Sequence, residues 1–186
     1  METVGIVGSG TMGAGIAQVA ALHGHTVVLY DVDEAAVERG LARVKSGLAR
    51  EVERGKRSVE DMDTALARLR PAADWHALGS ADWVIEAAVE DMEIKRLIFH
   101  DLDNVCAESA ILASNTSSLS IAALSGATQH PERVVGMHFF NPVAVVPLVE
   151  VVGGDQTSDE TVAAAVNLAR AGARPRCRLQ IRRGSS

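Results

Sequence analysis

A glycine-rich turn between two short apolar runs limits the folds open to this chain more than any other feature. The segment GSGTMG, residues 8–13, follows an apolar run that ends at Val7 and opens an alanine-rich stretch that reaches Leu22. A second apolar run, TVVLYD, closes on Asp31. This order predicts strand, tight turn, helix and strand, a unit typical of parallel strands joined by a crossover helix.

The spacing of the glycines also indicates a binding site. In the pattern GxGxxG, Gly8 permits the tight turn, Gly10 lets the backbone approach a pyrophosphate, and Gly13 lets helix and strand pack closely. The start of the helix offers unpaired N–H groups and a partial positive charge to phosphate. We therefore expect a dinucleotide site that includes Gly8, Ser9, Gly10, Thr11, Met12 and Gly13.

Asp31 indicates which dinucleotide is bound. It lies 23 residues after Gly8, where a carboxylate can accept hydrogen bonds from the adenosine ribose hydroxyls and would repel a 2′-phosphate. Because Val32, Asp33 and Glu34 follow instead of Arg or Lys, we expect NAD and not NADP. The alternative is a plain glycine-rich turn followed by an aspartate that caps a helix.

Helical and extended patterns alternate along the rest of the chain. Residues 34–70 have apolar residues three or four apart, interrupted at 53–58, which predicts two helices, the second capped by Ser58. A later helix is expected in DMEIKRLIFHDLDNV, and a last one after Ser158, which is expected to cap it. The apolar face of DMEIKRLIFHDLDNV is expected to contain Ile94, Leu97, Ile98 and Leu102.

Further strands are expected in ADWVIEAA, AILAS, RVVGMHFF and PLVEVV. The whole pattern predicts an α/β fold: a doubly wound, mostly parallel Rossmann-type sheet with helices on both faces and a helical excursion after the second strand. The 186-residue length fits one domain. We expect a dinucleotide-binding domain over residues 1–171 and an atypical arginine-rich tail over residues 172–186.

Charge and cysteine content narrow the class of protein. Residues 1–169 contain all 24 acidic groups, which argues against a nucleic acid partner. Residues 170–186 contain six arginines and are expected to form a solvated end, with contact to an anion as the alternative. Two cysteines indicate no disulfide framework. No 18-residue apolar span and no signal peptide are seen, so the expected location is cytoplasmic and off the membrane. Five histidines without metal-ligand spacing are interpreted as surface residues: His23, His25, His76, His100 and His130.

Polar side chains follow the later predicted strands, and ligands of open α/β sheets bind at the carboxyl ends of strands. His138 is the acid–base candidate, because an imidazole suits proton transfer near neutral pH. Glu150 lies within the apolar run VPLVEVV, where a carboxylate needs a partner, and His138 could be that partner. Ser117 and Asn141 could hydrogen-bond the reacting oxygen.

Each of these residues also has a structural interpretation. A histidine in a strand is more often a satisfied structural residue than a base. The segment NTSS, residues 115–118, favours a turn and a helix cap, and Glu150 could point to solvent. No one of these residues decides between catalysis and structure.

Three motifs in order carry a resemblance to a known family. GSGTMGAGIAQ, ASNTSSL and HFFNPVAVVPLVEVV resemble the NAD-binding domain of L-3-hydroxyacyl-CoA dehydrogenases, a family that includes 3-hydroxybutyryl-CoA dehydrogenases. The resemblance covers residues 3 to 171. It implies the oxidation of (S)-3-hydroxyacyl-CoA to 3-oxoacyl-CoA with NAD⁺, in fatty-acid or butanoate metabolism, with acyl-CoA as the partner molecule.

The resemblance also implies roles for single residues. His138 would be the catalytic base and Glu150 its partner, while Ser117 would contact substrate and nicotinamide and Asn141 would lie in the same site. The implied cofactor contacts include Glu90, Lys95 and Ser117. The implied candidates for CoA contacts are Lys56, Lys95 and Ser117.

The end of the chain departs from the family pattern. The family normally continues into a helical domain that carries dimer contacts and closes over acyl-CoA, but RAGARPRCRLQIRRGSS stands where its linker is expected. We therefore expect that domain to be absent and the surface it covers to be open to a second copy or a partner. The activity of this chain alone is expected to be weak, and the alternative function is a non-catalytic NAD-binding fragment or partner subunit.

Overall fold

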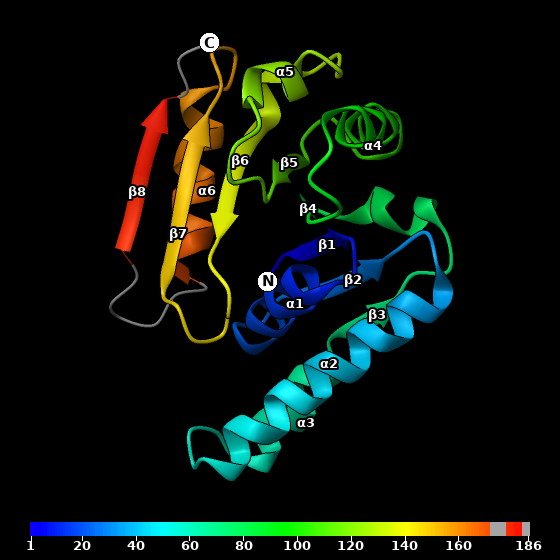
Figure 1. Cartoon of the computed structure of the whole chain (residues 1–186), viewed down its shortest axis with the longest axis vertical. Helices are drawn as coiled ribbons and strands as arrows, with labels where there is room; N and C mark the ends of the chain where they lie inside the picture. Colours follow the sequence, from blue (N-terminus) through cyan, green and yellow to red (C-terminus); the bar gives the residue numbers. More distant parts are fainter. Residues whose placement is uncertain (172–177, 184–186) are drawn as a thin grey trace.

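One eight-stranded sheet organises the protein. The computed structural model describes residues 1–171 and 178–183. The strands are β1 (Thr3–Val7), β2 (Thr26–Tyr30), β3 (Leu69–Pro71), β4 (Trp83–Glu86), β5 (Ile111–Ser114), β6 (Val134–Phe139), β7 (Leu148–Gly153) and β8 (Arg178–Arg183). Their order is β3-β2-β1-β4-β5-β6-β7-β8, and every neighbouring pair is parallel except the antiparallel pair β6–β7. This confirms the predicted doubly wound, mostly parallel sheet (Figure 1).

Helices cover both faces of the sheet. They are α1 (Thr11–Leu22), α2 (Glu34–Glu53), α3 (Val59–Leu66), α4 (Met92–Val105), α5 (Ile121–Ser125) and α6 (Asp159–Ala171), with short 3-10 helices η1 (Trp75–Ser80) and η2 (Pro131–Arg133). α1 and α6 belong to one buried cluster, while η1, α4 and α5 belong to the other. Figure 1 shows α6 behind β6 and β7 at one end of the sheet.

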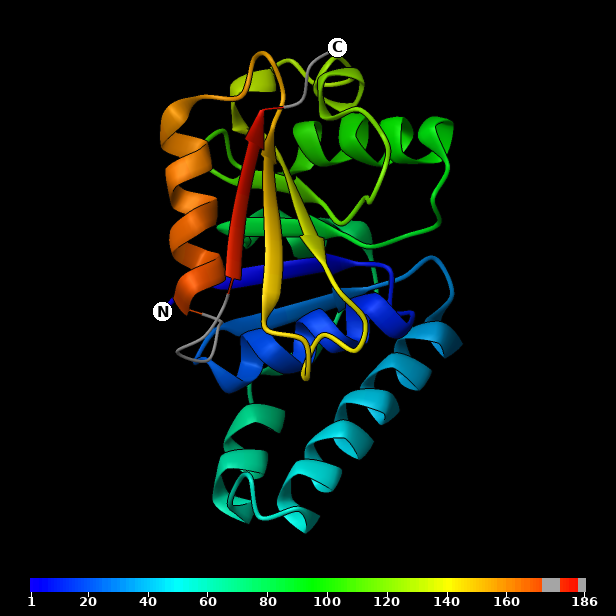
Figure 2. The same ribbon diagram turned by 60° about the vertical axis from the view of Figure 1, so that its left-hand side comes forward.

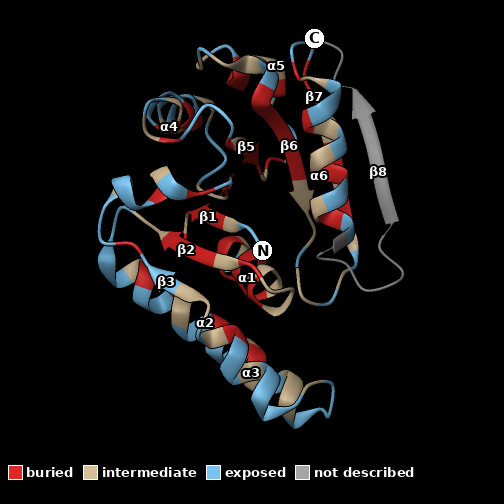
Figure 3. Ribbon diagram, turned by 180° about the vertical axis from the view of Figure 1, so that it is seen from behind, coloured by how far each residue is buried: buried red, intermediate tan, exposed pale blue. Residues whose placement is uncertain are grey.

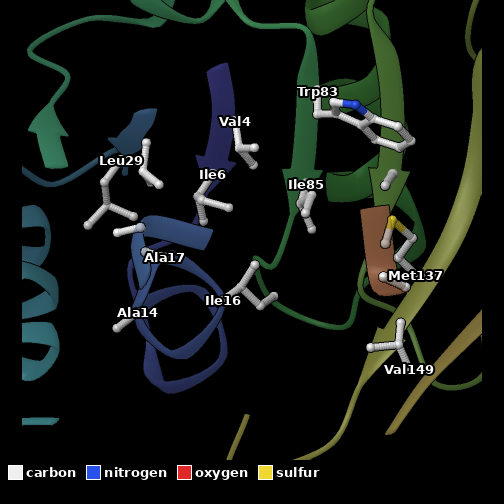
Figure 4. Packing of buried hydrophobic residues seen from close by; sticks show 14 of the residues in the cluster. Val4, Ile6, Ala14, Ile16, Ala17, Leu29, Trp83, Ile85, Met137 and Val149 are labelled. Carbon is white, nitrogen blue, oxygen red and sulfur yellow. The ribbon is translucent and has the colours of Figure 1, made fainter. Parts of the chain in front are cut away.

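Two-sided burial explains why the strands are continuously apolar. Val27, Val28 and Leu29 of β2 are all buried, the outer two in one cluster and Val28 in the other, as period-2 alternation requires. Figure 4 shows Ile16 of α1 packed near residues of neighbouring strands, including Ile6. The sheet interior is accordingly the most deeply buried part of the protein (Figure 3).

The helical excursion after β2 is also confirmed. α2 and α3 form a pair that projects beyond the sheet (Figure 2). Asp33 caps α2 by accepting a hydrogen bond from the Ala35 N–H. Ser58 and Asp61 form a reciprocal capping box at the start of α3, so the predicted cap is correct.

The predicted inner face of α4 is partly wrong. Leu102 is buried, but Ile94 and Leu97 are 43% and 66% exposed. The inward positions are Lys95, Phe99 and Leu102, spaced four and three apart. Lys95 can occupy the core face because its ammonium forms an ion pair with the buried carboxylate of Glu86. A pattern of apolar residues alone does not reveal such a pair.

Three further features differ from expectation. β3 is a three-residue edge strand that ends in Pro71, too short to show a periodic pattern. β8 pairs in parallel with β7, so part of the expected solvated tail extends the sheet; residues 172–177 and 184–186 of that tail lie outside the described residues. His25 is only 8% exposed and is not a surface residue.

In residues 1–171 and 178–183, no helix is both long enough and apolar enough to span a bilayer. No group of three or more His, Cys, Asp or Glu side chains in the same residues could hold a metal ion.

Candidate dinucleotide and catalytic site

The glycine-rich turn lies at the point where the strand order reverses, between β1 and β4. Gly8 has φ +96°, and a Cβ there would lie 2.7 Å from the carbonyl oxygen of Ala87, just after β4. A Cβ on Gly13 would lie 1.8 Å from the Gly8 carbonyl oxygen. Both positions therefore require glycine, which brings α1 against the carboxyl end of β1, where dinucleotides bind in such sheets.

Gly10 plays a different part. It has an ordinary φ of −63°, and a Cβ there would meet nothing within 4 Å. Gly10 is the N-cap of α1 but supplies no side-chain cap, and the first turn of α1 has no acidic residue. The open space in front of Gly10 and the uncapped helix start, with Thr11 exposed beside it, fit a bound diphosphate.

Asp31 is held in place by the same turn. Its Oδ2 accepts hydrogen bonds from the Ser9 backbone N–H and the Ser9 hydroxyl, both at 2.8 Å. Neither bond uses Oδ1, so that oxygen can accept from a ribose hydroxyl. Ser9 itself is buried, which makes it a positioning residue for Asp31. The uncapped helix and this carboxylate together fit NAD.

The structure brings His138 and Glu150 together. The two residues are register partners in the antiparallel pair β6–β7, so their side chains lie on the same face of the sheet. His138 Nδ1 lies 3.0 Å from Glu150 Oε2, with the two side chains 20% and 19% exposed. The Phe140 ring lies against the imidazole, with 4.3 Å between ring centroids.

This pairing decides which imidazole nitrogen can take a proton. A carboxylate only accepts hydrogen bonds, so the ring proton lies on Nδ1 and points at Glu150. Nε2 then carries the free lone pair. Nε2 of His138 therefore points away from Glu150, an orientation in which it can accept a proton.

Glu90 organises the loop after β5. Its Oε1 accepts hydrogen bonds from the Thr116 hydroxyl and, at 3.2 Å, from the Ser117 N–H. Burial works to raise the pKa of Glu90, but the Thr116 hydrogen bond, the charge of Lys95 and the Ser117 N–H outweigh it and hold the pKa below its ordinary value. Glu90 thus stays ionised and fixes the backbone at Ser117, whose own side chain is exposed.

Lys95 lies in the protein interior and not at the ligand-contacting surface that we expected. We expected Lys95 to contact the cofactor and CoA, but its side chain is 0% exposed. Its ammonium lies 2.6 and 2.8 Å from the two carboxylate oxygens of Glu86 and 3.4 Å from Glu90 Oε2. In this structure Lys95 acts behind the site surface, as a support for Glu90.

The sequence interpretation missed the role of Glu86. This residue ends the apolar strand β4, and its fully buried carboxylate also accepts hydrogen bonds from the Ala88 N–H and the Ser114 hydroxyl. The signal was the same as for Glu150, a carboxylate in an apolar run that needs a partner. Lys95, nine residues on, was that partner.

Asn115 connects two segments of the site, and Asn141 and Lys56 lie on a cleft. Asn115 Oδ1 accepts the Phe139 N–H at 2.9 Å, which ties the loop after β5 to the end of β6. Beyond β6, Asn141 lines an open cleft that also contains Thr11 and Lys56. A second, mostly apolar groove lies between α1, α6 and the segment 143–149. The structure therefore places Asn141 and Lys56 on one cleft that reaches the start of α1.

Comparison with known proteins identifies this arrangement. A family model described as 3-hydroxyacyl-CoA dehydrogenase, NAD binding domain, matches residues 3–176. The chain belongs to this family. Its cofactor is accordingly NAD, as Asp31 indicated.

The names of individual relatives agree with this family. The chain is 49% identical to a 3-hydroxyadipyl-CoA dehydrogenase of Escherichia coli over 87% of its own length and 34% of that protein. It is 45% identical to a probable 3-hydroxybutyryl-CoA dehydrogenase of Bacillus subtilis over 87% of its length and 56% of that protein. The crystal structure of (S)-3-hydroxybutyryl-CoA dehydrogenase PaaH1 from Ralstonia eutropha superposes with a TM-score of 0.95 at 43% identity, over 100% of this chain and 64% of that one. The chain therefore spans between a third and two thirds of the length of these relatives.

Proposed function

We propose that this domain takes part in the NAD-dependent oxidation of (S)-3-hydroxyacyl-CoA to 3-oxoacyl-CoA, with His138, Glu150, Ser117 and Asn141 in the catalytic site. The observation that carries the proposal is the pairing of His138 Nδ1 with Glu150 Oε2 at 3.0 Å. The pair lies on the sheet that carries a dinucleotide turn fitted to NAD. Relatives named as 3-hydroxybutyryl-CoA dehydrogenases support the substrate class.

His138 would remove the proton from the 3-hydroxyl group. Nε2 accepts that proton while Nδ1–H keeps its hydrogen bond to Glu150, which stabilises the imidazolium that forms. Bound NAD⁺ supplies the acceptor for the hydride that leaves the same carbon. Ser117, fixed through Glu90, and Asn141 would hydrogen-bond the developing carbonyl oxygen.

The cleft lined by Asn141 suits the polar part of an acyl-CoA. Lys56 lies on its rim, on the loop between α2 and α3, and provides a cation for a phosphate. Asn141 lies on the same cleft, so a ligand anchored at Lys56 can extend toward the loop that follows His138. We propose Lys56, and not the buried Lys95, as a CoA-binding residue.

The direct test is an assay of the purified chain with acetoacetyl-CoA and NADH, read as the loss of NADH absorbance. The proposal predicts oxidation of NADH that depends on acetoacetyl-CoA and is not supported by free acetoacetate. NADH binding by calorimetry is measured on the same sample. Binding without turnover would reject the enzymatic proposal and favour the alternative, a non-catalytic NAD-binding fragment or partner subunit, which the partial coverage of the relatives suggests.

Two further properties, self-association and cellular location, complete the proposal. We propose self-association through the apolar groove between α1, α6 and the segment 143–149, where Val145 is 63% exposed. Sedimentation velocity at several concentrations tests this, and a monomer at every concentration would reject it. We also propose a cytoplasmic location, which the buried free thiol of Cys106 suits.

A further inference from the structure

The cleft beside Asn141 gathers positive charge on a protein that is acidic overall. The whole chain has a formal net charge of −6. The cleft is nevertheless lined by four cations, namely Arg43, Arg50, Arg54 and Lys56, against one carboxylate, Glu51, which is bound by Gln18 and Arg57. Among the side chains that the structure describes, none of the four has a carboxylate within ion-pair distance. Such a set of cations on a concave surface indicates an anionic ligand.

Arg43 has a position in this set that the other three lack. Its Nη1 donates a hydrogen bond to the Ser9 carbonyl oxygen at 3.4 Å, inside the GxGxxG turn. It lines the cleft together with Thr11, the first residue of α1. The guanidinium therefore lies next to the uncapped helix start, where a bound diphosphate fits.

Close packing of α2 on the turn produces this position. A Cβ on Gly40, three residues before Arg43, would lie 2.8 Å from Ser9 Cβ and 2.9 Å from the Ser9 carbonyl oxygen. Gly40 is buried in this contact while Arg43 is exposed. The absence of a side chain at Gly40 lets α2 approach the turn, and the next helical turn then carries Arg43 to the mouth of the cleft.

We propose that Arg43 is a diphosphate-binding residue, which holds the ligand from α2 while the N–H groups of α1 hold it from the other side. The bond to Ser9 uses one of five N–H donors of the guanidinium, and the others can bind two phosphate oxygens at once. Two ligands of the proposed reaction contain a diphosphate ester, namely the dinucleotide and CoA. The inference rests on the proposed function only in taking these two as the ligands to test.

The experiment is a titration calorimetry series on the full chain, with NADH and CoA titrated separately. The variants are Arg43→Gln, Arg43→Lys and the control Lys45→Gln, which removes a positive charge from an exposed position of the same helix that lines neither cleft. Arg43→Gln is expected to weaken one ligand roughly tenfold to a hundredfold, as for the loss of a charge-assisted hydrogen bond, and to lower the salt dependence of its binding. Arg43→Lys is expected to recover part of the lost affinity, and Lys45→Gln is expected to bind both ligands with affinities within twofold of those of the parent.

The ligand whose affinity falls in Arg43→Gln identifies the source of the diphosphate. Loss of NADH affinity alone assigns Arg43 to the dinucleotide, and loss of CoA affinity alone assigns it to CoA. The proposal is overturned if Arg43→Gln leaves both affinities within twofold, if Lys45→Gln causes the same loss, or if the parent chain binds neither ligand. Because the readout is binding, a chain that binds NADH without turnover rejects the proposed function and leaves the role of Arg43 standing.

Discussion

His138 and Glu150 face each other across the only antiparallel strand pair among the described strands, β6–β7, with Nδ1 and Oε2 3.0 Å apart. Strand register fixes this relationship. A shift of β7 by one residue would turn Glu150 to the other face of the sheet and leave the imidazole without its carboxylate. The sheet therefore determines the tautomer of His138, and with it the nitrogen that is free to take a proton.

Gly10 and Gly13 should respond differently to the same added methyl group. Gly10→Ala is expected to leave the free energy of unfolding nearly unchanged but to abolish most NADH binding, because the Cβ would occupy the space in front of the turn. Gly13→Ala should destabilise the fold by about 2 kcal/mol or more, because its Cβ would lie 1.8 Å from a backbone oxygen. Urea unfolding and NADH titration of both variants measure the contrast. Equal effects on stability would show that Gly10 is also a packing position.

Asp31 should set the choice of cofactor. Asp31→Ala removes the ribose acceptor and the partner of Ser9, so NADH affinity is expected to fall about tenfold while discrimination against NADPH relaxes. Asp31→Asn, which keeps an oxygen acceptor without the charge, should relax discrimination with a smaller loss of NADH affinity. Calorimetry with both nucleotides measures this, and unchanged affinities would reject the ribose assignment.

The buried pair Lys95–Glu86 should be essential to stability when only one partner is removed. Lys95→Met leaves a carboxylate with 0% exposure and no counter-ion, and a loss of about 3–5 kcal/mol in unfolding free energy is expected. The double variant Lys95→Met/Glu86→Gln removes both charges and should recover part of that loss. Chemical denaturation of the parent, of Lys95→Met and Glu86→Gln singly, and of the double variant gives the coupling energy. Additive losses would mean that the two groups do not stabilise each other.

Glu90 should make stability depend on acid pH. Its pKa is lowered in the folded state from the ordinary 4.5, so the unfolded state binds the proton more readily. The stabilisation is therefore complete above about pH 4.5 and is lost as the pH falls through the lowered pKa. The difference in unfolding free energy between the parent and Glu90→Gln should be largest at neutral pH and narrow on acidification. A difference that grows toward low pH would contradict the assignment.

Local patterns in the sequence predicted the sheet and much of the site. The GxGxxG turn, the strand pattern and the caps at Ser58 and Ser158 depend on neighbours in sequence, and the structure agrees with them. The pairing of His138 with Glu150 could also be predicted from the sequence, because a carboxylate in an apolar strand needs a hydrogen-bond or ion-pair partner.

Other features depended on contacts between distant segments. Lys95 faces the core because its ammonium donates hydrogen bonds to the carboxylate of Glu86, which belongs to β4. Helix periodicity counts only apolar residues, so it assigned the wrong residues to the inner face of α4. β8 is a strand because β7 offers a free edge, which composition does not reveal. The position of Arg43 depends on how closely Gly40 lets α2 approach Ser9.

The most direct measurement compares the parent chain with His138→Gln for acetoacetyl-CoA-dependent oxidation of NADH, with NADH affinity measured on the same samples. Glu150→Gln serves as the companion variant, expected to lower turnover more than NADH affinity. The account predicts that His138→Gln lowers turnover by roughly 10²–10⁴-fold, the contribution of a general base, while NADH affinity stays within about twofold. Turnover of the parent that is indistinguishable from that of His138→Gln would contradict it.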